Sequence, residues 1–204
     1  MRQYISIFLT CILLLGCKGK QAQEESKQEQ PSFSIPANTE ALLGASLSDL
    51  TRQYGEKHVY YSNNYGFFCW VDEEDLSVFF HVPKMPYETL DIESLPMVYD
   101  PEEGYDYYDF SAGEYAPDDF LVYSVIIRKS SLPKMFGGKD PVTLDLINEI
   151  FDKPGRMQVE YDQGMITGNS AGPFILEGKD NAIIYVSFSL DLKGNAAAAS
   201  VWLK

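Results

Sequence analysis

Carboxylates and tyrosines gathered between positions 99 and 119 are the side chains of this chain best suited to chemistry. The densest run supplies Tyr99, Asp100, Glu102, Glu103, Tyr105, Asp106, Tyr107, Tyr108 and Asp109. From Met85 to Ile127 the sequence has no Lys, Arg or His. Because like charges at this density repel one another, the run requires positive charge from elsewhere in the chain or from a partner.

Three interpretations of this acidic, tyrosine-rich segment are open. In the first, it is a solvated loop whose tyrosines pack over the edge of the domain. In the second, it is a protein-binding surface, because tyrosine offers a large contact area and interleaved carboxylates suit a basic partner. In the third, it binds Ca²⁺ through carboxylate oxygens. The order Asp100-x-Glu102-x-Gly104 departs from that of an EF-hand, so we predict no defined metal site.

The sequence offers little for catalysis beyond its carboxylates. A His-Glu-x-x-His pair and a Walker loop are absent, and the two histidines, His58 and His81, flank apolar, strand-like residues. Cys69 lies in the apolar run 65–71, which predicts a buried structural thiol rather than a nucleophile. We therefore predict a protein without catalytic activity, catalytic residues or cofactors. A hydrolase that uses a pair of carboxylates from segment 99–119 is the alternative hypothesis.

The N-terminus has the organisation of an export signal. Arg2 precedes an apolar run over 5–15, which is shorter than the roughly 20 residues of a typical membrane-spanning helix. The run closes on Leu14-Leu15-Gly16-Cys17, which resembles the lipobox of bacterial lipoproteins. This resemblance implies a signal peptide over 1–16 and acylation of Cys17, which would anchor the chain in a membrane.

The compartment follows from the same resemblance. Lys18 differs from the aspartate that retains lipoproteins in the inner membrane, so the resemblance implies the outer membrane of a bacterial cell envelope, with the domain facing the periplasm or the cell surface. Residues 17–34 are polar and nearly free of large apolar groups, which predicts a flexible tether. A single globular domain is then expected over 35–204.

Composition and charge narrow the classes of partner. Hydrophobic residues make up 45% of the chain and aromatic residues 14%, which indicates a packed core. The formal net charge of −14 disfavours nucleic acid and anionic lipid surfaces, because both are bound through basic patches. A basic protein is the partner that this charge suits.

Two similar patterns of a short helix followed by strands organise the domain. Ser46 and Asp49 have the spacing of a capping box, which predicts a helix over 46–54 that ends at Gly55, and a second helix is predicted over 143–151. Strands are expected at 58–61, 66–71, 76–82, 157–161, 183–192 and 196–203. The predicted fold class is α+β, an antiparallel sheet packed by two short helices, with candidate tandem repeats at 40–95 and 140–204.

The first of these helices carries a further resemblance. The pattern Ser46-Leu47-x-x-Leu50-x-x-x-Tyr54-Gly55, followed by strands, is similar to that of small lipoproteins of the β-barrel assembly machinery and of β-lactamase inhibitory proteins. Those families bind other proteins and have no active site. The resemblance implies a protein-binding module of the cell envelope, either an assembly or scaffold factor or an inhibitor or immunity protein.

Overall fold

The computed structural model of this chain describes residues 32–86, 91–151, 158–162, 165–178 and 181–204. The predicted signal peptide, Cys17 and most of the predicted tether lie outside the described residues. Residues 31–204 form one compact unit. No helix in the described part of the chain is long and apolar enough to cross a membrane.

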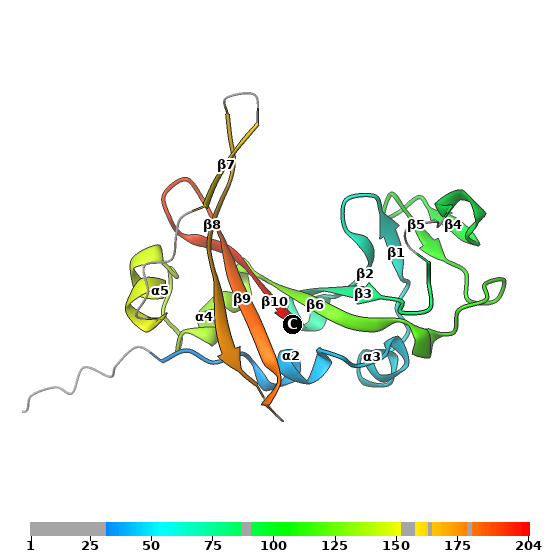
Figure 1. Ribbon diagram of the computed structural model, residues 1–204, viewed down its shortest axis with the longest axis horizontal. Coiled ribbons are helices and arrows are strands. Elements are labelled where there is room, and N and C mark those ends of the chain that lie inside the picture. Colours follow the sequence, from blue (N-terminus) through cyan, green and yellow to red (C-terminus); the bar gives the residue numbers. More distant parts are fainter. Residues whose placement is uncertain (1–31, 87–90, 152–157, 163–164, 179–180) are drawn as a thin grey trace, which may run out of the picture. The chain divides into compact units, whose positions relative to one another are not determined.

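One antiparallel sheet organises this unit (Figure 1). Its strands are β1 (Tyr60–Ser62), β2 (Gly66–Val71), β3 (Leu76–His81), β4 (Met97–Asp100), β5 (Tyr105–Tyr108), β6 (Leu121–Arg128), β7 (Gln158–Asp162), β8 (Met165–Glu177), β9 (Ile183–Leu190) and β10 (Ala196–Leu203). In space the ten strands follow the order β4-β5-β1-β2-β3-β6-β10-β9-β8-β7. The sheet therefore has β4 and β7 at its two edges.

Short helices accompany the strands. The α-helices are α2 (Ala37–Leu42), α3 (Leu47–Tyr54), α4 (Leu132–Met135) and α5 (Leu144–Phe151). Single 3-10 turns are η1 (Asp72–Glu74), η2 (Ile92–Ser94), η3 (Pro117–Asp119) and η4 (Lys129–Ser131). The structure thus confirms an α+β fold built on an antiparallel sheet, with α2 and α4 in addition to the two predicted helices.

The strand order contains two four-stranded meanders. Strands β1, β2, β3 and β6 form the first, strands β7, β8, β9 and β10 form the second, and the two meet where β6 pairs with β10. Helices α2 and α3 precede the first meander in the chain, and α4 and α5 precede the second. The β4–β5 hairpin is inserted between β3 and β6, and it extends the sheet at the outer edge of β1, where Tyr107 pairs with Tyr60.

The predicted capping box of α3 is present. The backbone N–H of Asp49 donates a 3.2 Å hydrogen bond to Ser46 Oγ, and the Ser46 N–H donates one of 3.3 Å to Asp49 Oδ2. Gly55 ends the helix with φ = +78°, a backbone conformation that glycine adopts without strain. Leu47 and Leu50 are thereby turned into the core.

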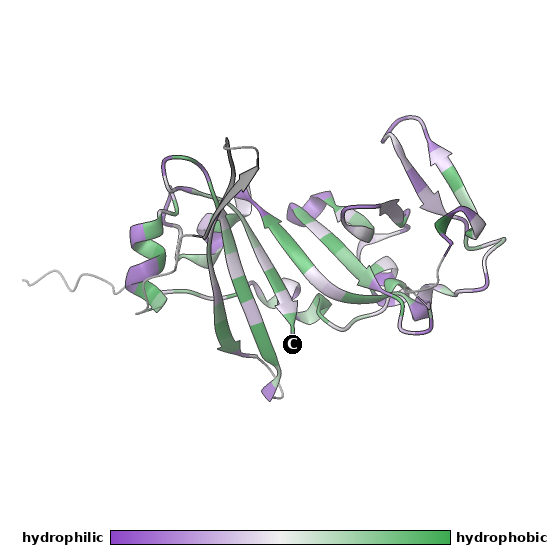
Figure 2. Cartoon of the chain, turned by 45° about the horizontal axis from the view of Figure 1, so that its top comes forward, coloured by the Kyte–Doolittle hydropathy of each residue, from purple (hydrophilic) through white to green (hydrophobic). Residues whose placement is uncertain are grey.

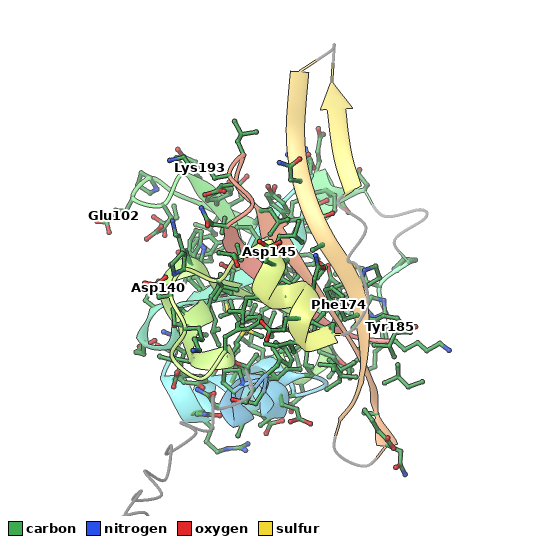
Figure 3. The ribbon with its side chains drawn as sticks, turned by 90° about the vertical axis from the view of Figure 1, so that its left-hand side faces the viewer. Glu102, Asp140, Asp145, Phe174, Tyr185 and Lys193 are labelled. Atoms are coloured by element: carbon green, nitrogen blue, oxygen red, sulfur yellow. The ribbon has the colours of Figure 1, made fainter. Side chains whose placement is uncertain are left out.

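The main core lies between the helices and one face of the sheet. It combines helix residues such as Leu50 and Ile147 with sheet residues such as Phe67, Val125 and Phe188. In Figure 3, α5 lies beside β8, and the labelled Phe174 of β8 stacks on Phe151 of α5 with ring centroids 4.1 Å apart. We call this side of the sheet the helix side.

The domain begins earlier than predicted. The ring of Phe33 packs edge-on against Phe136 and Phe151, with centroids 5.3 Å and 4.9 Å away. The Ser34 N–H donates a 3.0 Å hydrogen bond to the carbonyl oxygen of Met135. The predicted tether over 17–34 is therefore too long at its C-terminal end, because an aromatic residue within it is part of the core.

Candidate protein-binding face

The opposite side of the sheet carries a second aromatic cluster. Tyr60, Phe68 and Phe79 are its buried members, and Trp70, Tyr107 and Ile126 pack against them. The cluster follows from strand geometry, because successive side chains point to opposite faces. In β2, Phe67 and Cys69 belong to the main core, whereas Phe68 and Trp70 belong to this cluster. We call this side of the sheet the aromatic face.

Strand register joins the aromatic cluster to a row of side chains across nine strands. From β4 to β8 the paired residues are Val98, Tyr107, Tyr60, Phe68, Phe79, Ser124, Trp202, Tyr185 and Ile175. Tyr185 and Trp202 stack on each other with centroids 5.7 Å apart and planes at 16°. Figure 2 shows the corresponding alternation of hydropathy along the strands. All members of this row except Ser124 are apolar or aromatic.

The aromatic face is partly open to solvent. Among the described residues, the second cluster contains no helix side chain; it is closed by the rings of its own strands. Toward the ends of the row, Val98 is 40% exposed and Ile175 is 68% exposed. Apolar side chains are therefore exposed toward both ends of this face, and exposed apolar surface marks interaction sites in soluble domains when it is contiguous.

The acidic, tyrosine-rich segment supplies one end of this face. Its densest part is the β4–β5 hairpin, whose tip is hydrophilic in Figure 2, rather than a loop. Register splits the predicted binding residues between the two sides of the sheet. Asp100, Tyr105 and Tyr107 share the aromatic face, because Tyr107 packs with Tyr60 and the Tyr105 ring lies 5.3 Å from that of Phe68.

The other predicted binding residues lie elsewhere. Tyr99 and Asp106 pair with each other and project to the helix side of the hairpin, where both are exposed. Glu102 and Glu103 are exposed in the turn at its tip. The structure therefore brings only part of the predicted set onto one surface.

Tyr108 requires a correction. It is 2% exposed, and its hydroxyl oxygen accepts a 3.2 Å hydrogen bond from the Tyr115 N–H. Its ring fills the space beside Gly113, where an added Cβ would lie 2.1 Å from the Tyr108 hydroxyl oxygen. Tyr108 is a core residue, and the prediction that it contacts a partner is wrong because register turns it toward the main core.

Two of the predicted carboxylates shape local turns. The pKa of Asp100 lies below its usual value. Its carboxylate accepts hydrogen bonds from the backbone N–H of Glu102, then from the hydroxyl of Tyr60 and the N–H of Glu103. Hydrogen bonds from the side chain and N–H of Ser111 lower the pKa of Asp109. Both carboxylates therefore stay ionised at neutral pH while they accept hydrogen bonds within the chain.

Within the described residues, one ion pair supplies positive charge to the segment. Lys84 Nζ lies 2.5 Å from Asp119 Oδ1, at the C-terminal end of the segment. Among the described residues, none of the ion pairs within 4.0 Å involves the β4–β5 hairpin. The carboxylates at the hairpin tip, Glu102 and Glu103, are thus available to a positively charged partner.

Comparison of the chain with protein-family models, with curated proteins and with solved structures finds no match.

One catalytic sequence pattern lies in β8. Residues 168–172 read Gly-Asn-Ser-Ala-Gly, which matches the Gly-x-Ser-x-Gly pattern of a nucleophile elbow. That motif requires a turn from a strand into a helix, whereas these residues lie within β8. Gly172 instead allows β8 to pack closely against β9, since an added Cβ would lie 2.8 Å from the carbonyl oxygen of Val186.

Among the residues that the structure describes, neither histidine lies on a strand next to that of Ser170. His81 lies on β3 and His58 just before β1, whereas three other strands separate β3 from β8 in the sheet. Cys69 is 1% exposed, and burial raises the pKa of its thiol to about 12. In the described part of the chain, no three His, Cys, Asp or Glu residues are grouped to hold a metal ion.

Proposed function

We propose that this chain is an exported lipoprotein, anchored through Cys17 in the bacterial cell envelope, that binds another protein and catalyses no reaction. The binding surface is the aromatic face together with the tip of the β4–β5 hairpin. The partner is a basic protein. The role is that of an assembly or scaffold factor, or of an inhibitor or immunity protein that covers a basic toxin or enzyme.

The observation that carries this proposal is the aromatic row on the side of the sheet away from the helices. Tyrosine and tryptophan are enriched in protein interfaces, because they bury large areas at a small cost in side-chain entropy. The row combines Trp202, Tyr185 and Tyr107 with exposed aliphatic residues at both ends. A rigid sheet holds these side chains in place, so little ordering is needed on binding.

The charge of the hairpin favours a basic partner. Glu102 and Glu103 are exposed at its tip, and the chain as a whole has a formal net charge of −14. Opposite charges across an interface accelerate association and discriminate against wrong partners. A carboxylate hydrolase or a Ca²⁺-dependent binder remains the alternative hypothesis.

We also propose that the domain is a tandem repeat. Each repeat comprises two short helices followed by a four-stranded meander, and the last strands of the two meanders, β6 and β10, pair with each other. The β4–β5 hairpin is an insertion into the first repeat. This arrangement supports repeats somewhat longer than the ranges 40–95 and 140–204 that the sequence indicated, since the first includes β6 and the second includes α4.

The hairpin supplies a test with a matched control. The full chain, tagged at its C-terminus, would be used to capture partners from detergent-solubilised envelopes of its own cells. One variant, Val98→Ala with Tyr105→Ala, removes exposed groups from the aromatic face. The control, Tyr99→Ala with Asp106→Asn, changes exposed groups on the helix side of the same hairpin.

The proposal expects the first variant to lose the partner that both the natural chain and the control retain. Replacing Glu102 and Glu103 by Gln is expected to weaken capture, and more so at low ionic strength, because exposed charges are screened by salt. Failure to capture any protein at low salt would contradict the proposed function. Calcium binding and hydrolase activity would then be measured on the same preparations.

A further inference from the structure

An apolar cleft opens beside the aromatic cluster. It has a volume of about 310 Å³ and is lined by Tyr65, Gly66, Phe67, Phe80, His81 and Tyr123. Phe67 and Phe80, at 1% and 2% exposure, belong to the core, whereas Tyr65 and Tyr123 are 59% and 44% exposed. Two buried core residues and two exposed tyrosines therefore both line the cleft.

A β-bulge lies at one side of this cleft. Phe79 pairs with Ser124 and Phe80 with Val122, so Tyr123 of β6 has no partner residue on β3. An unpaired residue of this kind bends its strand and redirects its side chain. Burial of part of the ring raises the pKa of the Tyr123 hydroxyl. Bulges are frequent beside functional sites in sheets.

The cleft borders the aromatic cluster at one residue. The ring of Tyr65 lies 6.2 Å from that of Phe79, a buried member of the aromatic cluster. Strands β1 and β2 separate β3 from β5 in the sheet, so the β3 residues of the cleft lie three strand spacings, about 14 Å, from the hairpin. An extended peptide covers this distance with about four residues.

We propose that this cleft is the docking pocket for one large apolar side chain, leucine, methionine or phenylalanine, in a basic segment of the partner protein. Lys or Arg side chains about four residues away in that segment lie against the carboxylates at the hairpin tip. This proposal rests on the proposed protein-binding function and specifies the chemistry of its partner.

Size and charge select this occupant. The cleft volume is at the lower end of the range of about 300–1,000 Å³ for small-molecule pockets, which suits a single side chain. Interface energy concentrates in anchors that fill such pockets near the centre of a contact surface. Glu102 and Glu103 are exposed, and among the described residues no cation forms an ion pair with them. These carboxylates therefore disfavour an acidic partner segment and favour a basic one.

A displayed library of random peptides of about 12 residues, long enough to span cleft and hairpin, tests this proposal. The library is selected on the full chain in detergent and counter-selected on the Tyr65→Ala, Tyr123→Ala double variant. Leu192→Ala, which changes an 81% exposed side chain outside the cleft, is the matched control. Near-ultraviolet circular dichroism verifies that each variant keeps its tertiary packing.

The expected peptides carry a large apolar residue about four positions from a pair of basic residues. The double variant should weaken their binding by about tenfold or more, and Leu192→Ala should leave it unchanged. Binding should also fall between roughly 50 mM and 300 mM salt. Peptides without basic residues, equal binding to the double variant, or no enrichment at all would overturn the proposal.

The envelope capture experiment separates this inference from the proposed function. If the double variant captures the same partner as strongly as the natural chain, the cleft is not the docking pocket, although the protein-binding function stands. If the natural chain captures a partner and the double variant loses it, the anchor of that partner is identified by cross-linking from position 123. A large apolar residue about four positions from basic residues is the expected product.

Discussion

The hydroxyl of Tyr60 donates a 3.0 Å hydrogen bond to Asp100 Oδ2 and so ties β1 to the end of β4. Two other donors, the N–H groups of Glu102 and Glu103, reach the second oxygen of the same carboxylate at 2.9 Å and 3.4 Å. One carboxylate therefore fixes both the turn of the acidic hairpin and its attachment to the aromatic face.

This pair predicts a pH dependence of stability at both ends of the scale. The pKa of Asp100 is lowered in the folded chain. Its contribution to the free energy of unfolding is therefore complete above the unfolded-state pKa of about 3.9, and it is lost as the pH falls through the folded-state pKa. The pKa of Tyr60 is raised, mainly by burial and then by the Asp100 hydrogen bond, so its contribution is lost as the pH rises above about 10.

Urea unfolding between about pH 3 and pH 11 measures both effects. Asp100→Asn should flatten the acidic limb of the stability curve, and Tyr60→Phe should flatten the alkaline limb. Asp106→Asn is the matched control, since this exposed carboxylate belongs to the same hairpin but projects to the helix side. Equal curves for Asp100→Asn and the natural chain would contradict this role of Asp100.

Cys69 gives a prediction about reactivity. The thiol is 1% exposed, and burial raises its pKa to about 12, so almost no thiolate is present at neutral pH. In the native chain, Cys69 should resist alkylation, and it should react rapidly once urea unfolds the domain. Mass spectrometry of the Cys69 peptide measures the labelling without interference from other cysteines. Rapid labelling of the folded protein would indicate an exposed or mobile β2.

Short-range sequence patterns explain which helices and strands could be predicted correctly. The capping box and the terminal glycine define α3 within a few neighbouring residues, and they appear in the structure as expected. Strand β10 has the predicted bounds of 196–203, because a turn signal precedes a regular apolar run. The apolar run 66–71 predicted β2. Because this strand has large apolar residues on both sides, it contributes to the core on one face of the sheet and to the aromatic cluster on the other.

Non-local pairing explains what the sequence did not predict. The β4–β5 hairpin combines acidic residues of low strand propensity with tyrosines, and its place in the sheet depends on the pairing of Tyr107 with Tyr60, far away in the chain. Strand β8 was missed because Gly172 and Pro173 interrupt its pattern at a bulge. The cleft at Tyr123 depends on another bulge, for which the sequence carries no distinct signal.

Phe33 tests where the domain begins. Its ring contacts those of Phe136, Phe151 and Phe188, and it is partly buried against the main core. Phe33→Ala should lower the free energy of unfolding by about 2–4 kcal/mol, through lost burial and the cavity left behind. Phe33→Leu should cost less, because most of the volume remains. Unfolding in urea at constant protein concentration measures both, and an unchanged midpoint for Phe33→Ala would place this residue in the tether.

Cys17 tests the predicted anchor. If the sequence Leu14-Leu15-Gly16-Cys17 is a lipobox, the thiol of Cys17 carries the acyl chains, and Cys17→Ser should leave an unprocessed precursor without them. Cells grown with an alkyne-labelled fatty acid should label the natural chain and lose this label in the variant. Cys69→Ser is the control and should keep the label, because the Cys69 side chain is buried in the core. A Cys17→Ser chain that is still labelled and still fractionates with membranes would show that the anchor lies elsewhere.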